Sequence, residues 1–123
     1  MDSLIIEATE DTPNVILSQS ENKFLISDRS LPENSIEFYL PILNWLEKYS
    51  VNPNPVTHFE FKLEYFNTSS AKQIAKVLLM LEKVSKVSDV LVKWYYSKDD
   101  KDILASGSRY EKLINIKFQL IEI

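Results

Sequence analysis

The chain has 123 residues, 45% of them hydrophobic, and its 14 Lys and Arg against 18 Asp and Glu give a formal net charge of -4. This length and composition predict a single domain over residues 1–123 with one core, and exclude a disordered chain. With no Cys, one Gly and one His, the chain excludes disulfides, thiol catalysis and thiolate zinc sites, and disfavours glycine-rich phosphate loops and His-based catalysis.

The first part of the chain predicts strands. Residues 1–12 mix apolar and acidic types, as an edge strand or a loose arm would. Val15–Gln19 and Lys23–Ser27 predict two short strands, because their apolar residues flank the turn-forming segment Ser20–Asn22. An antiparallel hairpin is therefore expected at one edge of the sheet.

A helix is predicted from Ser30 onward. Ser30–Glu33 has the spacing of a capping box, in which the Ser hydroxyl accepts from a free backbone amide and the Glu reaches back. Pro32 suits a first turn, Pro41 predicts a kink, and Asn52–Pro55 predicts the end of the helix. The apolar positions at helical spacing, expected to face the core, are Ile36, Tyr39, Leu40, Leu43 and Leu46.

The second half alternates strands with helices. Thr57–Tyr65 is the clearest strand, because polar and apolar residues alternate along it. Helices are predicted over 69–86 and 99–113, and strands over 90–95 and 115–123. The side chains of the clearest strand that are expected to point inward are Phe59, Phe61, Leu63 and Tyr65.

This order of elements predicts an α/β fold. Strands separated by helices imply right-handed crossovers and a mostly parallel sheet. Because the strands alternate wet and dry faces, we expect a two-layer domain with a mixed sheet and helices on one face only. The longest apolar run, Val77–Leu81, is far shorter than the roughly 18 residues of a membrane span, and no signal peptide is evident. We expect a cytoplasmic protein that binds neither membrane nor, given its acidity, nucleic acid.

One polar segment lies where a predicted strand passes into a helix. Asn67, Thr68, Ser69 and Ser70 follow Tyr65-Phe66, and all four residue types cap helices by accepting from unpaired backbone amides. Alternatively, one hydroxyl accepts a phosphate, since a helix start offers free amides and the positive end of the helix dipole. On these grounds Thr68, Ser69 and Ser70 are equal candidates.

The chain resembles the SiaC family of bacterial regulatory phosphoproteins, whose fold is similar to that of the anti-sigma-factor antagonists (STAS-like domains). The resemblance runs from about Asn14 to Ile123. The segments that carry it, in this order, are Ser27–Asn34, Trp45–Glu47, Lys62–Ser70, Trp94–Tyr96 and Asp99–Asp102. The Leu-Glu-Tyr-Phe-Asn-Thr-Ser-Ser run within the third segment is the most specific of them.

The resemblance implies a non-enzymatic partner switch. A partner kinase would phosphorylate Thr68, and a phosphatase of the metal-dependent 2C type would remove the phosphate. The bare form would bind and activate a diguanylate cyclase, which raises cyclic di-GMP and favours biofilm formation. Asn67, Ser69 and Ser70 would form the neighbourhood of the phosphosite, and Glu33 and Asn34 match a family loop expected at the same rim. Around Ala105–Arg109 the chain departs from the family, which is acidic near Gly107.

Two other functions stay open at this stage. The protein could be a constitutive adaptor, or an anti-sigma-factor-antagonist-like protein with another target, in which case Thr68 would only help to cap a helix. It could also be a small hydrolase using Glu60, Glu64 or the acidic run Asp99–Asp102, although strand carboxylates facing solvent lack the tuned pKa and excluded water that catalysis needs. We predict no catalytic residue in the chain itself.

The remaining polar features favour ordinary structural roles. The acidic run Asp99–Asp102 fails the calcium-loop pattern, which needs a Glu where Tyr110 stands, and it suits a helix start. His58 is expected on the solvent face of its strand, and Trp94 in the core. The lysines at 72, 76, 83 and 86 are expected on the solvated side of their helix, with partner docking as the alternative. No metal and no cofactor are predicted.

Overall fold

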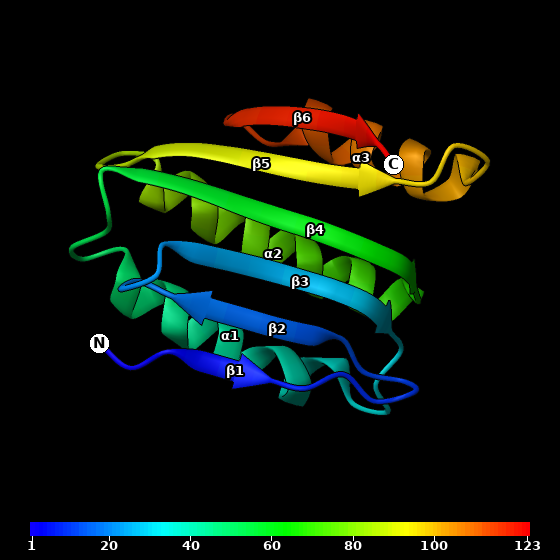
Figure 1. Ribbon diagram of the computed structural model, residues 1–123, viewed down its shortest axis with the longest axis horizontal. Coiled ribbons are helices and arrows are strands. Elements are labelled where there is room, and N and C mark those ends of the chain that lie inside the picture. The colour runs from blue at the N-terminus through cyan, green and yellow to red at the C-terminus, as the bar shows by residue number, and fades with distance from the viewer.

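The computed structural model describes all residues, 1–123, as one six-stranded sheet with three helices (Figure 1). The strands lie side by side in chain order, with β1–β2 and β2–β3 antiparallel and the neighbours from β3 to β6 parallel. The elements are β1 (Leu4–Ile6), β2 (Asn14–Ser18), β3 (Lys23–Ser30), α1 (Ser35–Tyr49), β4 (Val56–Phe66), α2 (Thr68–Val84), β5 (Asp89–Tyr96), α3 (Lys101–Leu113) and β6 (Lys117–Glu122).

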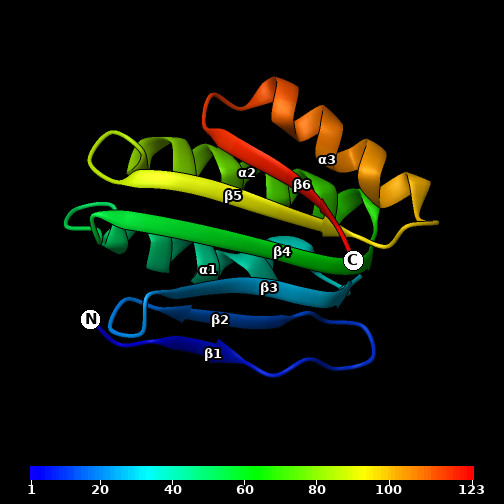
Figure 2. The ribbon, with the colours of Figure 1, turned by 45° about the horizontal axis from the view of Figure 1, so that its top comes forward.

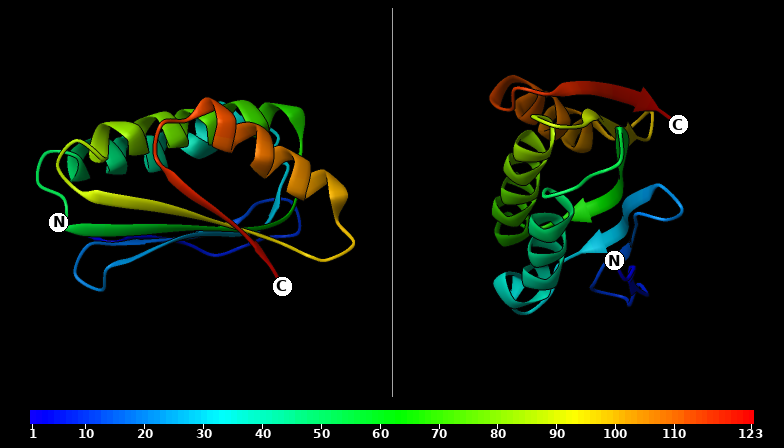
Figure 3. Two further views of the ribbon diagram at one scale, coloured as in Figure 1. Left: turned by 90° about the horizontal axis from the view of Figure 1, so that it is seen from above. Right: turned by 90° about the vertical axis from the view of Figure 1, so that its left-hand side faces the viewer.

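All three helices cover the same face of the sheet, and the other face is open to solvent (Figure 3). Helices α1 and α2 lie side by side over the middle strands, and α3 lies beside α2 towards β6 (Figure 2). The predicted two-layer α/β fold with a mixed, mostly parallel sheet is therefore confirmed. The N-terminal residues form the short edge strand β1 that was one of the two expectations.

The core lies between the sheet and the helices and is rich in aromatic rings. Phe24, Phe59, Phe61 and Trp94 form a chain of ring contacts across β3, β4 and β5, with successive centroids 6.4, 4.9 and 5.3 Å apart. Such a chain follows from the register, which pairs Phe24 with Phe59 and Phe61 with Trp94 on one face. The expected core position of Trp94 is confirmed, because its side chain is fully buried.

The predicted start of the first helix was wrong. Helix α1 begins at Ser35, and its N-cap is Asn34, whose side chain accepts from the Glu37 amide. Ser30 instead ends β3 and is fully buried, so it has no capping role. Pro41 lies inside α1 without ending it, and the predicted kink stays a prediction.

Three residues predicted to face the core are exposed instead. Ile36 and Leu40 are 65% and 51% exposed, because the inner face of α1 is made by Tyr39, Ile42, Trp45, Leu46 and Tyr49. Tyr65 is 47% exposed. The pairing of β3 with β4 shifts by one residue between Asp28 and Arg29, so the alternation reverses after Leu63 and Phe66, not Tyr65, packs against Trp94.

Candidate functional site

The site lies where the parallel strands end and the helices begin. Asn67 directly follows β4 and caps α2, its side-chain oxygen accepting from the Ser70 amide at 2.9 Å. Asn34 does the same for α1 at the Glu37 amide, 3.0 Å away. We call this region the rim and define it as residues 30–37 and 64–72.

A buried chain of hydroxyls joins the two halves of the rim. The Ser70 hydroxyl donates to the backbone carbonyl of Ser30 at 2.9 Å, and the Ser30 hydroxyl donates to Ser70 Oγ at 2.9 Å. The Tyr39 hydroxyl lies 2.7 Å from Ser30 Oγ and, since the Ser30 proton is already used, it is the donor there. The Asn67 amide also donates to the Ser30 carbonyl, at 3.1 Å. All three hydroxyl-bearing residues are fully buried.

Helix α3 holds the first turn of α2 from its other side. The Tyr110 hydroxyl donates to the carbonyl of Ala71 at 2.8 Å. Together with the bonds to Ser30, this contact fixes the backbone of α2 immediately after Thr68. The start of α2 is therefore a rigid feature of the domain, because both its neighbouring helix and its neighbouring strand hold it.

Burial of the two tyrosines that hold the rim changes their acidity. Burial raises the pKa of Tyr39 to about 12, partly opposed by its hydrogen bonds to Ser30 and Ser70. Burial likewise raises the pKa of Tyr110 to about 12, with the Arg109 charge opposing the effect and Tyr39 adding to it. The raised pKa keeps both tyrosines in the neutral form, whose hydroxyl donates the hydrogen bonds described above.

These shifts predict a loss of stability in alkali. Because the folded pKa lies above the unfolded one, the stabilisation is fully present below about pH 10 and falls as pH rises towards about 12. We expect the free energy of unfolding to fall over this window by up to about 2 kcal/mol for each tyrosine, measured by urea unfolding at a series of pH values. In Tyr39→Phe the fall should be smaller, and an unchanged slope would contradict the assignment.

The structure separates the three candidate phosphate acceptors. Ser70 is fully buried and its hydroxyl is bonded to Ser30, so a kinase cannot reach it without unfolding the rim. Ser69 is exposed, and its hydroxyl donates to Asn67 Oδ1 at 3.1 Å. Thr68 is exposed at the first position of α2 and takes no part in these capping bonds. Thr68 and Ser69 are thus the accessible hydroxyls.

Of the other predicted site residues, some lie on the surface and one holds the helix in place from below. Glu33 and Asn34 are exposed and lie before α1, joined to the start of α2 through Ser30. Ser70 lies beneath the surface and can act on a partner only by holding α2 in place. Sequence reasoning missed Tyr39 and Tyr110 as supports of the rim, because their partners Ser30 and Ala71 lie in other elements, and no local pattern signals such bonds.

The remaining predicted features take the structural roles expected of them. Asp100 caps α3, its carboxylate accepting from the Ile103 amide at 3.0 Å. His58 is exposed on the open face of the sheet. No group of three or more His, Cys, Asp or Glu is placed to hold a metal ion, and no helix is long and apolar enough to cross a membrane.

Fold and rim together define a small two-layer α/β domain with an exposed hydroxyl at a fixed helix start. The chain belongs to the SiaC family of regulatory phosphoproteins, whose family model matches residues 6–123. An uncharacterised protein of Pseudomonas aeruginosa, PA14_02130, is 23% identical over 121 residues, covering 98% of this chain and 96% of the relative.

Solved structures of Pseudomonas aeruginosa SiaC share the fold. One matches with a TM-score of 0.89 at 22% identity and covers 100% of both chains. Another, the crystal structure of the diguanylate cyclase SiaD in complex with its activator SiaC, matches with a TM-score of 0.89 at 22% identity, over 98% of this chain and 99% of that one. The family assignment and the fold expected from the sequence are thus confirmed, and the protein is a SiaC family regulatory protein.

Proposed function

We propose that this protein is a non-enzymatic switch whose unphosphorylated form binds and activates a diguanylate cyclase, and that phosphate on Thr68 blocks this. The observation that carries the proposal is the position of Thr68, exposed at the first turn of a helix whose start is fixed by buried hydrogen bonds. Family membership and the complex of the relative SiaC with SiaD support a cyclase as the target.

A phosphate on Thr68 would change the surface without unfolding it. It would add about -1.5 to -2 charges beside the positive end of the α2 dipole, which stabilises anions. The capping bonds of Asn67 and the bonds between Ser70 and Ser30 leave the Thr68 hydroxyl out, so they would persist. Phosphorylation would then block docking by charge and bulk.

The chemistry of the switch would come from partners. A cognate protein kinase would add the phosphate and a 2C-type phosphatase would remove it, while this chain supplies the acceptor and the docking surface. Glu33, Asn34, Asn67 and Ser69 would contact these partners at the rim, where they lie exposed or half-buried. The product of the activated cyclase, cyclic di-GMP, would then promote biofilm formation.

The experiment compares bare and Thr68-phosphorylated protein in one titration against the cognate diguanylate cyclase, with binding and cyclase activity measured together. We expect binding and activation by the bare protein and by Thr68→Ala, and loss of at least about tenfold in affinity on phosphorylation, as a buried like charge produces. Ser69→Ala is the matched control: it keeps the Thr68 acceptor, so it should still lose binding when phosphorylated, and its two forms are compared with each other because Ser69 is itself a proposed rim contact. Equal binding of both forms would refute the switch and favour a constitutive adaptor.

A further inference from the structure

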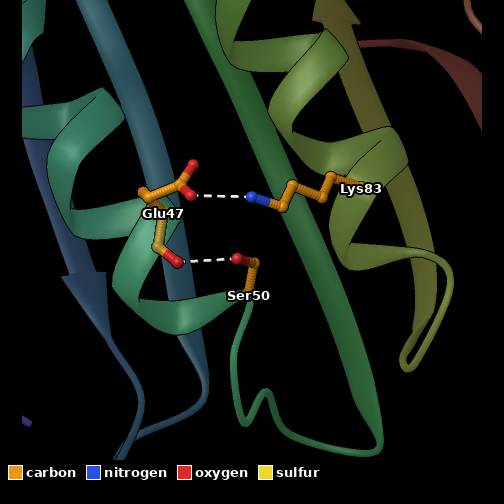
Figure 4. A network of polar contacts seen from close by, with 3 residues as sticks. All are labelled: Glu47, Ser50 and Lys83. Atoms are coloured by element: carbon orange, nitrogen blue, oxygen red, sulfur yellow. Dashed lines mark hydrogen bonds and ion pairs between the residues drawn. The ribbon is translucent and has the colours of Figure 1, made fainter.

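The outer side of α1 carries an apolar row that faces α2. Ile36, Leu40, Leu43 and Glu47 recur at spacings of three and four residues and so share one side of the helix. The Lys83 ammonium of α2 lies 2.7 Å from Glu47 Oε1 (Figure 4). Since this ion pair places Glu47 beside α2, the rest of the row lies along the junction of the two helices.

The facing side of α2 is basic. Thr68, Lys72, Lys76, Leu79 and Lys83 are all exposed on the outer side of this helix. Its only carboxylate, on Glu82, accepts from the Asn115 amide at the opposite side, so it does not offset these lysines along the junction. Since Glu47 already pairs with Lys83, the local excess of positive charge lies at Lys72 and Lys76, in a chain of net charge -4.

The two helices run in the same direction, because each joins neighbouring parallel strands and both begin at the rim. Leu40 and Lys76 each precede the paired residues Glu47 and Lys83 by seven positions, and Ile36 and Lys72 precede them by eleven. Since both helices rise by about 1.5 Å per residue, we infer that Leu40 lies level with Lys76 and Ile36 with Lys72. Ile36, Leu40 and Leu79 are 65%, 51% and 55% exposed. We call this surface the α1–α2 seam and define it by Ile36, Leu40, Lys72, Lys76 and Leu79.

From this surface we propose that the α1–α2 seam docks an amphipathic helix whose apolar stripe is flanked by Asp and Glu. The apolar side chains of the seam would cover the stripe, and the lysines would pair with the flanking carboxylates, as in other complexes where a helix lies in a groove. Assigning this helix to the cyclase rests on the proposed function above, whereas the chemistry of the helix rests on the seam itself.

The seam ends at Thr68, which gives the phosphate a direct effect on docking. Thr68 and Lys72 are four residues apart on one side of α2, the spacing at which opposite charges pair along a helix. A phosphate on Thr68 would draw the Lys72 ammonium away from a partner and would repel the acidic flank of the docking helix. The control residue and the docking surface are thereby continuous.

The first test needs no cyclase. A designed helix of about 18 residues, roughly five turns, with a Leu stripe and Glu flanks is titrated into the ¹⁵N-labelled full chain, and a peptide with Lys in place of every Glu is the control. We expect amide shifts concentrated in α1 and the outer side of α2, and no saturation with the Lys peptide. No shift with the Glu peptide, shifts centred on the open sheet face, or equal binding of both peptides would overturn the inference. So would binding of phosphatidylglycerol vesicles through the same residues, which would assign the seam to a lipid surface.

The second test uses paired exchanges and the cognate cyclase. Leu40→Asp, and Lys72→Glu combined with Lys76→Glu, should each weaken binding about tenfold or more, as loss of a docking anchor or reversal of charge does. Leu113→Asp, and Lys86→Glu combined with Lys112→Glu, are the same exchanges at exposed positions outside the seam; they should bind as the wild type does, and thermal unfolding checks that every variant folds. If the seam variants bind the cyclase as tightly as the wild type does, the proposal that the seam docks the cyclase is wrong, while the proposed phosphorylation switch still stands. If the wild type itself does not bind the cyclase, the proposed switch is wrong. The peptide titration then decides whether the seam docks an acidic amphipathic helix.

Discussion

Ser30→Ala should lower the free energy of unfolding by about 2 to 3 kcal/mol, because it leaves the buried Tyr39 hydroxyl without its acceptor and removes the bond to Ser70 Oγ. The Ser30 hydroxyl accepts from Tyr39 at 2.7 Å and donates to Ser70 at 2.9 Å. Removing it leaves the Tyr39 hydroxyl proton without an acceptor in a fully buried position. The change in side-chain volume is small, so the loss comes mainly from the missing hydrogen bond. Urea unfolding followed by circular dichroism measures the loss.

A double-mutant cycle with Tyr39→Phe serves as the control. Tyr39→Phe removes the hydroxyl that Ser30→Ala leaves without an acceptor. The double variant should therefore lose less free energy of unfolding than the two single variants added together. Ser69→Ala, at an exposed hydroxyl of the same rim, should change stability by no more than about 0.5 kcal/mol. Additive losses, or a Ser30→Ala protein as stable as wild type, would show that this chain of hydroxyls does not hold the rim.

Local pattern predicted the elements of this fold well, because each element carries its own periodicity. The alternation in β4 and the helical spacing in α2 each determine which side chains face the core. Both survive in the structure, since the sheet is covered on one face only. The order of elements then limited the topology to crossovers of one hand, which is why the parallel arrangement followed from sequence.

Ser30 shows where local pattern fails. Its spacing to Glu33 is that of a capping box, yet the Ser30 hydroxyl pairs with Ser70, 40 residues away. Whether a serine caps a helix or bonds across the core depends on what packs over it, and the sequence window around it does not contain that information. Tyr65 fails for a related reason, since a single shift in the pairing of β3 with β4 reverses every later side chain.

The sequence located the candidate site but did not show which of its hydroxyls is accessible. Capping propensity alone treats Thr68, Ser69 and Ser70 alike, because each offers a hydroxyl at a helix start. Burial distinguishes them, since Ser70 points into the core. The proposed acceptor Thr68 and its buried support Ser70 therefore lie two residues apart and have opposite roles, and the choice of Thr68 over Ser69 stays a prediction that phosphorylation with the cognate kinase must test.

Gly107→Ala should destabilise the domain by about 2 kcal/mol net, although alanine is the better helix former by about 1 kcal/mol. A Cβ at Gly107 would clash with Trp94 Cδ1 and would lie 2.6 Å from Trp94 Nε1 and 2.8 Å from Leu120 Cδ2. Trp94 has no room to move, because it is fully buried and its indole N–H donates to the Ile103 carbonyl at 2.9 Å. Helix α3 would have to lift from the sheet, and urea unfolding would record the loss.

The sign of the stability change in Gly107→Ala distinguishes the steric clash with Trp94 from the effect of helix propensity. Ala105→Gly, at an exposed position of the same helix, should cost about 1 kcal/mol through propensity alone. Gly107→Ala would gain that amount if only propensity mattered, so a stabilised protein would refute the contact. Because Tyr110 on α3 bonds to Ala71 in the first turn of α2, lifting α3 should also loosen the start of α2. Faster hydrogen exchange at the amides of residues 70–74 in Gly107→Ala, but not in Ala105→Gly, is therefore expected.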